Sequence, residues 1–408
     1  MKMQTLVGGG AFLIASLVAS LLFGYSLSAP TVPIIYVDPS SPPGGNGNSW
    51  ETACRDLQTA IDAAPPEARI WCASGDFGQI AIAKPICLWG GFAGTEEYLD
   101  ERSLSAHECI IRSLTVTAGV ELDGFTFFPS DHRGRSVFLN ADDAVLANCR
   151  FDRCSSEQEL ILSRNSTGIY LINCTVTGCA AGAKMPVSLI RFDNCQDVVV
   201  ANCTIADNRL TSSDRAILDF HDSKGEVFNT ILWNPGYREI DADGTADLIV
   251  SDSDIRLGFP GEGVFSSDPL FADDYHLGAE SPCRDIGSPE GAPEDDREGD
   301  PRPFGRGYDI GADECLLPGV PFEPTAAFSP PSPEADRPIR SFPRRLGGTP
   351  PPISPSPSPT PDFSPSPTPV PSASPTPVWY NAFKVQASAD DAHEPGIGTR
   401  SSTNIMTD

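Results

Sequence analysis

One short phrase recurs in the middle of the chain at a nearly constant interval. It occupies residues 147–151, 172–176 and 201–205, each with an Asn-Cys pair at its centre, and a related phrase follows at 228–232. The three Asn residues are 25 and then 29 residues apart. Short apolar segments repeated at such a period predict the coils of a solenoid, in which each coil stacks on its neighbour.

The stretches around these phrases read as short strands separated by polar turns. The predicted coils cover residues 137–150, 160–177, 189–205 and 217–232. Because no helical pattern lies between the strands, an alternating strand–helix layout is excluded, and an all-β parallel β-helix over 34–316 is predicted. Residues 56–64 have apolar side chains at helical spacing, which predicts a helix that caps the N-terminal end of the core.

The two ends of the chain have different compositions. Residues 1–28 combine Lys2, an apolar run and small residues before a cleavage point, which predicts a secretory signal peptide; an uncleaved anchor is the alternative. Residues 317–378 are rich in Pro, Ser and Thr and predict a disordered linker, followed by a short disordered tail at 379–408. We therefore expect a secreted or cell-surface monomer with no membrane span in the mature chain.

The charge balance limits the partners of the chain. It has 28 basic and 55 acidic residues, a formal net charge of −27. Nucleic acid is excluded as a partner because phosphate binding needs clustered Lys and Arg. Such a surface attracts divalent cations, although solubility alone also explains it.

Several short motifs in order along the chain resemble a known group of proteins. They are Tyr36-Val37-Asp38, Ser49-Trp50, Asp56-Leu57-Gln58, the stretch 90–96, Asp268-Pro269-Leu270-Phe271 and Asp309-Ile310-Gly311-Ala312. The chain resembles the bacterial secreted β-helix proteins of the pectin-lyase-like superfamily, specifically the choice-of-anchor Q domain proteins. The resemblance covers roughly residues 34–315 and implies a right-handed parallel β-helix on an exported protein. It implies no catalytic residues.

The recurring Asn and Cys residues have a structural interpretation. Equivalent residues in stacked coils lie about 4.8 Å apart, so Asn148, Asn173 and Asn202 predict a ladder of side-chain amides. Cys149, Cys174 and Cys203 share this period and predict a stack of buried thiols. Glycosylation is the alternative at Asn173, Asn202 and Asn165, which match the acceptor pattern.

Twelve cysteines in an exported chain make disulfides chemically feasible. Cys154 and Cys179 are 25 residues apart, and equivalent positions in neighbouring coils fall within bonding range. Cys283 and Cys315 could close the end of the folded region. No Cys-x-x-Cys pair is present, which argues against zinc and thioredoxin-like sites.

The best candidates for chemistry lie on two adjacent predicted coils. Strand alternation turns charged side chains outward, giving the catalytic candidates Arg191, Asp193, Asp219, His221 and Asp222. Calcium, the one cofactor considered, would use Asp193, Asp197, Asp219 and Asp222. Superfamily enzymes abstract a proton with calcium present or hydrolyse with paired carboxylates, and both reactions need such a face. A solvated charged surface is the alternative.

The sequence leaves the function open between two classes. The coils are uniform in length, which argues against a deep cleft and favours a structural, adhesive or glycan-binding role. The alternative is a polysaccharide lyase or glycoside hydrolase acting on the outer face of the β-helix. In both cases the partner is a polysaccharide or cell-surface glycan. The acidic run at 294–300 is expected to be a solvated turn.

Overall fold

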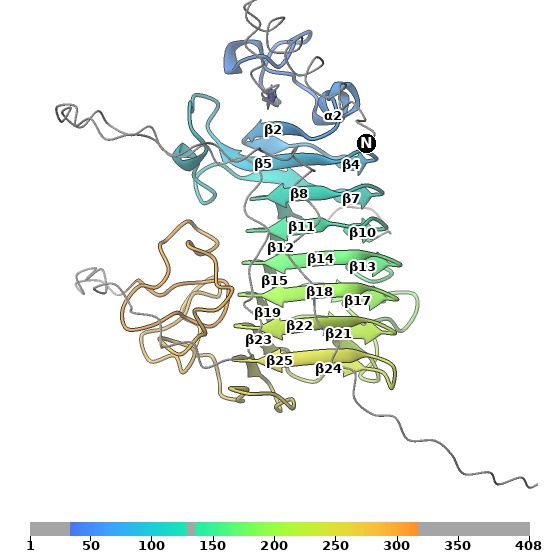
Figure 1. The fold of residues 1–408 in the computed structure, drawn as a ribbon, viewed down its shortest axis with the longest axis vertical. Coiled ribbons are helices and arrows are strands. Elements are labelled where there is room, and N and C mark those ends of the chain that lie inside the picture. The colour runs from blue at the N-terminus through green and yellow to red at the C-terminus, as the bar shows by residue number, and fades with distance from the viewer. Residues whose placement is uncertain (1–32, 129–134, 317–408) are drawn as a thin grey trace, which may run out of the picture. The chain divides into compact units, whose positions relative to one another are not determined.

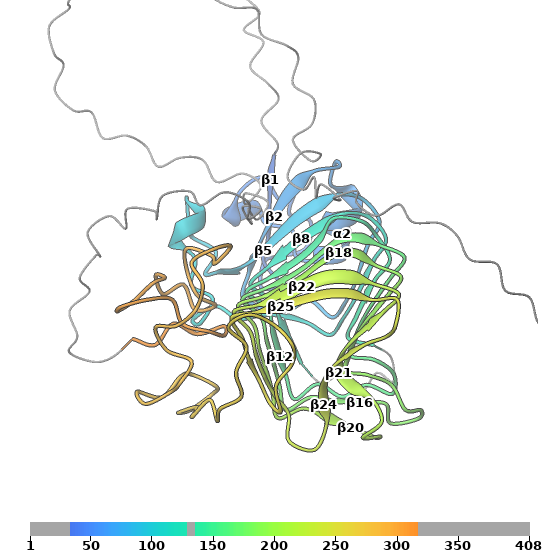
Figure 2. The ribbon, with the colours of Figure 1, turned by 60° about the horizontal axis from the view of Figure 1, so that its bottom comes forward.

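The structure, a computed structural model, describes residues 33–128 and 135–316. Over this part the chain coils repeatedly through three parallel sheets, which we call A, B and C (Figures 1 and 2). One coil runs through sheet C, then sheet A, then sheet B, before it reaches sheet C again one strand further along. The predicted parallel β-helix is confirmed. The signal peptide, linker and tail predictions lie outside the described residues.

The strands of each sheet come from successive coils. Sheet A contains nine described strands: β1 (Ile34–Val37), β2 (Ala68–Ala73), β5 (Ile86–Phe92), β8 (Val120–Asp123), β11 (Ala144–Ala147), β14 (Thr167–Ile172), β18 (Gln196–Ala201), β22 (Lys224–Phe228) and β25 (Asp247–Ser251). Sheet B contains eight: β3 (Gly75–Asp76), β6 (Cys109–Ile111), β9 (Thr126–Phe127), β12 (Arg150–Asp152), β15 (Thr175–Thr177), β19 (Thr204–Ala206), β23 (Ile231–Trp233) and β26 (Asp254–Ile255).

Sheet C carries the charged residues singled out above. Its seven described strands are β4 (Gln79–Ile82), β7 (Ser113–Val116), β10 (Val137–Leu139), β13 (Ile161–Arg164), β17 (Ile190–Asp193), β21 (Ala216–His221) and β24 (Arg238–Ala242). A short pair, β16 (Ala180–Ala181) and β20 (Arg209–Leu210), lies apart from the three sheets. Two short 3-10 helices lie at η1 (Trp50–Thr52) and η2 (Leu99–Glu101).

Strand alternation fills the interior. In β17, Ile190 and Phe192 are fully buried, whereas Arg191 and Asp193 lie on the outer face. Inward aromatic rings stack between coils, as Phe127 does on Phe151 with ring centroids 4.4 Å apart. This regular stacking of apolar side chains holds the coils together because each coil buries its inner face against the next.

The capping helix is α2 (Leu57–Ala63). The side chain of Asp56 accepts a hydrogen bond from the backbone N–H of Thr59 at 2.7 Å and so caps its N-terminus. Its apolar face, which includes Leu57 and Ile61, is buried in the same core as the first strands. The prediction of a helix that covers the end of the core is confirmed. Within the described residues no helix is long and apolar enough to cross a membrane.

The recurring Asn residues mark the bend from sheet A to sheet B. Asn148, Asn173, Asn202 and Asn229 all have positive φ, between 47° and 53°. Asn tolerates this left-handed backbone better than most residues because its short amide bonds locally. The repeated phrase is thus a bend residue followed by a buried Cys.

Residues 268–315, which we call the C-terminal segment, fold back along the outside of sheet B. Figures 1 and 2 show this segment in orange beside the strands of that sheet. It builds a second small core from Leu277, Cys283, Ile310 and Cys315 against Ile231 of β23. The outer face of sheet B is therefore covered there, whereas the outer face of sheet C carries partly exposed charged residues.

Candidate functional site

The charged residues predicted from the sequence meet on the outer face of sheet C. Arg191 of β17 is in register with Asp219 of β21, and Asp219 is in register with Asp241 of β24. Asp193 is in the same way in register with His221. Because neighbouring strands lie about 4.8 Å apart, these side chains form one continuous array across three coils.

The first half of the array is a network of ion pairs. Arg191 Nη1 lies 2.7 Å from Asp219 Oδ2, and Arg191 Nη2 lies 3.7 Å from Asp193 Oδ1. Ser188 donates a hydrogen bond to Asp219 Oδ2 at 3.0 Å, and Arg164 Nε lies 2.8 Å from Asp193 Oδ2. Both carboxylates are thus already neutralised by guanidinium groups. Calcium binding by Asp193 and Asp219 stays a prediction, and in this structure Arg164 and Arg191 are their partners.

The second half of the array combines a His with carboxylates from two coils. His221 Nδ1 lies 2.6 Å from Asp243 Oδ2, and His221 Nε2 lies 3.7 Å from Asp222 Oδ2. Thr245 Oγ1 contacts Oδ1 of Asp222 and lies 2.9 Å from Oδ1 of Asp243. Hydrogen bonds from Thr245, assisted by the nearby His221, hold the pKa of Asp243 below its usual value.

This second group could hold a cation. One ligand atom each from His221, Asp222 and Asp243 lies within 4.8 Å of the others. Thr245 adds an oxygen next to the two carboxylates, so Asp222, Asp243 and Thr245 form a set of oxygen donors of the kind that Ca²⁺ takes. Of the four predicted calcium ligands only Asp222 belongs to it. Asp197 lies on β18 of sheet A and is not a member of the group.

Sequence reasoning missed Asp243 and Thr245. They follow β24, beyond the last recognisable Asn-Cys phrase, so no repeat aligned them with His221. The signal that could have found them is Asp243-Gly244-Thr245, an acidic turn one coil after His221 and Asp222. Such turns bring carboxylates of adjacent coils side by side in a solenoid.

The Asn ladder forms only in part. Asn148 Nδ2 donates to Asp123 Oδ1 at 2.8 Å, and Asn173 Nδ2 donates to Asn148 Oδ1 at 3.1 Å. Asn202 is fully buried, yet neither atom of its amide has a hydrogen-bond partner among the described residues. The prediction that Asn202 extends the ladder is therefore wrong. Burial of Asn173 and Asn202 also excludes a glycan at either position in the folded chain.

A second buried polar column lies outside the phrases that the sequence highlighted. Asn208 Nδ2 donates to Asn234 Oδ1 at 3.0 Å, and Asn234 Nδ2 donates to Glu239 Oε2 at 2.7 Å. Burial raises the pKa of Glu239 to about 7. The 26-residue spacing of Asn208 and Asn234 could have indicated this column from the sequence, but no Cys accompanies these Asn residues, so the repeat was not recognised.

All twelve cysteines are free thiols, so neither predicted disulfide is present. The thiol of Cys154 donates to the carbonyl oxygen of Phe127 at 3.0 Å rather than bonding to Cys179. Cys315 lies 3.2 Å from the carbonyl oxygen of Leu277, and Cys283 contacts Asp254. The stack of Cys149, Cys174 and Cys203 is fully buried, as predicted.

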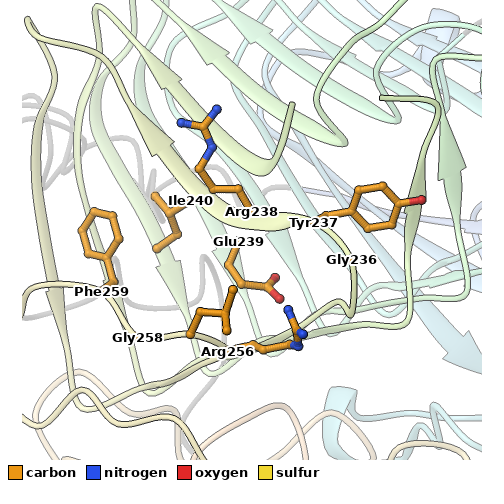
Figure 3. Close-up of a pocket in the computed structure, with 9 residues that line it drawn as sticks. Gly236, Tyr237, Arg238, Glu239, Ile240, Arg256, Gly258 and Phe259 are labelled. Carbon is orange, nitrogen blue, oxygen red and sulfur yellow. The ribbon is translucent and has the colours of Figure 1, made fainter. Parts of the chain in front are cut away.

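A surface pocket of about 400 Å³ lies at the C-terminal end of the β-helix. Figure 3 shows Glu239 and Arg256 side by side in it, with Phe259 further along the same wall. Both carboxylate oxygens of Glu239 accept hydrogen bonds from Asn234, at 2.6 and 2.7 Å. The carboxylate of Glu239 is thus part of the buried polar column. We therefore interpret this pocket as a structural feature of the last coil and not as a catalytic site.

No family model matches the chain. Over 141 residues it is 30% identical to Pectinesterase 4 of Arabidopsis thaliana, a match that covers 30% of this chain and 23% of that protein. The chain thus spans less than a quarter of the length of this curated relative.

A solved structure is also similar. The crystal structure of pectate lyase Pel9A is 14% identical, with a TM-score of 0.26, over 70% of this chain and 96% of that one. By its own strand arrangement, three parallel sheets in stacked register, the chain is a parallel β-helix.

Proposed function

We propose that the chain is an exported carbohydrate-active protein that binds an acidic polysaccharide on the outer face of sheet C and cleaves it. The observation that carries this is the group formed by His221, Asp222, Asp243 and Thr245 beside the ion pair of Arg191. In narrower terms, we place the chain among the bacterial choice-of-anchor Q proteins, at the cell surface or secreted. The motifs at both ends of the β-helix support that placement.

Substrate binding at this face needs a positive charge, because the chain carries a net charge of −27 and Arg191 and Arg164 are already paired. The oxygen donors of Asp222, Asp243 and Thr245 fit Ca²⁺. A bound calcium ion would neutralise the carboxylate of a uronate sugar at this point. Polyuronates are therefore the substrate class that fits.

His221 is placed to take a proton. Its Nδ1 lies 2.6 Å from Asp243 Oδ2, so that carboxylate accepts the Nδ1 hydrogen and leaves the lone pair on Nε2. We infer that Nε2 removes the hydrogen next to the uronate carboxylate. The electron pair of that C–H bond forms a carbon–carbon double bond, and the glycosidic C–O bond breaks. The leaving oxygen takes a proton from water, so the product is an unsaturated sugar.

The match to a stretch of a pectinesterase supports a pectin-type polysaccharide as substrate. A second candidate is binding without cleavage. The uniform length of the coils favours it. Neither of the two described surface pockets is an enclosed cavity.

The test uses the full mature chain with polygalacturonate and other polyuronates, with Ca²⁺ or with chelator. Ultraviolet absorbance from unsaturated products in the Ca²⁺ arm is the expected result. Binding without any such product supports the second candidate. If no acidic or neutral polysaccharide is bound or cleaved, both candidate functions are contradicted.

A further inference from the structure

A second group of metal-ligand side chains lies in the C-terminal segment, away from sheet C. His276 Nε2 lies 3.8 Å from Glu298 Oε1 and 4.0 Å from Asp313 Oδ1. One ligand atom from each residue lies within 4.8 Å of the others. The three residues come from three separate stretches of the segment, so whatever joins them would fasten those stretches together.

A backbone contact fixes the orientation of the His276 ring. Its Nδ1 lies 2.9 Å from the carbonyl oxygen of Asp273, which can only accept, so Nδ1 carries the hydrogen. Nε2 faces two carboxylate oxygens at distances too long for hydrogen bonds. Metal-binding His residues typically donate their other ring N–H to a backbone carbonyl in this manner.

The two carboxylates are held in place from behind. Asp313 Oδ2 accepts the backbone N–H of Leu277 at 2.7 Å, which leaves Oδ1 to face the ring. The loop at Glu298 is fixed because Asp296 Oδ1 accepts the N–H of Glu298 at 2.9 Å and that of Asp300 at 2.8 Å. The expectation of a solvated turn at 294–300 is thus wrong, since Asp296 is buried.

The surroundings are acidic, with one exception. Burial, with Asp296 and Asp313 nearby, raises the pKa of Asp300. Arg297 contacts Glu298 Oε1 and is mostly buried. A cation bound by the group would therefore share Glu298 with Arg297 and would lie on the His276 side.

We propose that His276, Glu298 and Asp313 bind a divalent transition-metal ion, Zn²⁺ or Mn²⁺. One imidazole nitrogen with carboxylate oxygens, completed by water, is a donor set that suits these ions. Calcium takes oxygen donors instead, which distinguishes this group from the one on sheet C.

The metal would act as a clip for the C-terminal segment. Two residues before His276, the carboxylate of Asp274 pairs with Arg150 of β12 at 2.8 and 2.9 Å. Three residues before Glu298, the carbonyl oxygen of Asp295 accepts a hydrogen bond from Asn173. Joining these two stretches through one ion therefore tightens the hold of the segment on sheet B and on the Asn ladder.

Titration of the full chain with Zn²⁺ and with Mn²⁺, monitored by calorimetry, tests the proposal. We expect stoichiometric binding, with affinity lowered by about tenfold or more in His276→Asn and in the isosteric Asp313→Asn. His107→Asn should bind as the unaltered chain does. Hydrogen exchange should show added metal slowing exchange at residues 296–300 and 310–313.

Two results would overturn the clip. One is the absence of stoichiometric binding of either ion. The other is binding that His276→Asn and Asp313→Asn leave intact, or that Asp243→Asn abolishes, since the ion would then belong to sheet C. If either altered chain does not fold by circular dichroism, Glu298→Gln replaces it, with the same expected loss. Because polyuronate cleavage depends on His221 and Asp243, it can fail without affecting this result.

Discussion

The side chain of Asn173 joins two parts of the chain that are 122 residues apart. Its Nδ2 donates to Asn148 Oδ1 at 3.1 Å within the ladder and to the carbonyl oxygen of Asp295 at 2.7 Å in the C-terminal segment. Asn173 is therefore both a bend residue of its own coil and the contact that fastens the segment to the β-helix.

We expect Asn173→Ala to destabilise the fold by about 1–3 kcal/mol more than Asn194→Ala. Asn194 is a matched control: its φ of 55° is close to the 53° of Asn173, and it also donates to an Asn one coil earlier, but in an exposed position. The cost of placing Ala in a left-handed backbone is therefore similar in the two variants. The difference between their free energies of unfolding measures the contribution of the buried Asn173 amide. Urea unfolding measures it, and equal losses in the two variants would contradict the role given to Asn173.

Gly311→Ala should loosen the C-terminal segment. Gly311 has a φ of +110°, and a Cβ there would lie 2.9 Å from both Ile231 Cδ1 and Thr204 Oγ1 on sheet B. Gly299→Ala is the control, since Gly299 has a φ of +97° and nothing within 4 Å of such a Cβ. We expect the Gly311 variant to lose about 1–3 kcal/mol more. Faster proteolysis within residues 268–315 should accompany this loss. If the Gly311 variant were cleaved as slowly as the Gly299 variant, the close packing of Gly311 on sheet B would be refuted.

The stability of the fold should fall as pH rises from about 4 to 7. Burial raises the pKa of Glu239 to about 7 and that of Asp254 to about 6. In the unfolded chain both carboxyls titrate near pH 4, so the folded state holds more protons between these limits. Their contribution is complete below about pH 4 and is lost as pH passes through the folded values.

Urea unfolding at a series of pH values measures this slope. Glu239→Gln should make it shallower between about pH 5 and 7, whatever the variant does to absolute stability, because one of the titrating groups is gone. Asp247→Asn, whose side chain is 71% exposed, should leave the slope unchanged. An unaltered slope in Glu239→Gln would show that the buried carboxyl does not titrate in this window.

His221→Gln should lower the rate of polyuronate cleavage by about 10²–10⁴-fold, the usual contribution of a general base. Asp222→Asn should raise the Ca²⁺ concentration needed for activity, because it removes a charged oxygen donor. Asp197→Asn serves as control, since Asp197 lies on sheet A and should not affect the rate. Initial rates of absorbance increase at several Ca²⁺ concentrations provide the measurement. A His221 variant as active as the Asp197 variant would remove His221 from the reaction.

Much of the β-helix could be predicted because its physics is local and repeated. Strand alternation placed Ile190 and Phe192 inside and Arg191 outside, as the structure has them. The Asn period marked equivalent positions in successive coils, and the structure places these residues at the bend between sheets A and B, where the backbone is left-handed. Both signals come from neighbouring residues or from a fixed repeat.

The contacts that the sequence did not reveal are those that no repeat encodes. Asp193 and Asp219 were calcium candidates, and only strand register shows that they face Arg164 and Arg191. Asp243 was missed because it follows the last recognisable coil. The C-terminal segment has no periodicity, so its position on sheet B could not be read from its residues.

The C-terminal segment also has a consequence for how the protein can change in length over evolution. It bonds to Asn173 through Asp295 and to Asn229 through both backbone groups of Ser288, at 2.8 Å each. These anchors are two coils apart, so the length of the segment between Ser288 and Asp295 has to match that distance. A duplicated or deleted coil between Asn173 and Asn229 would pull one anchor out of reach, whereas coils before Asn148 carry neither of these anchors and can vary in number.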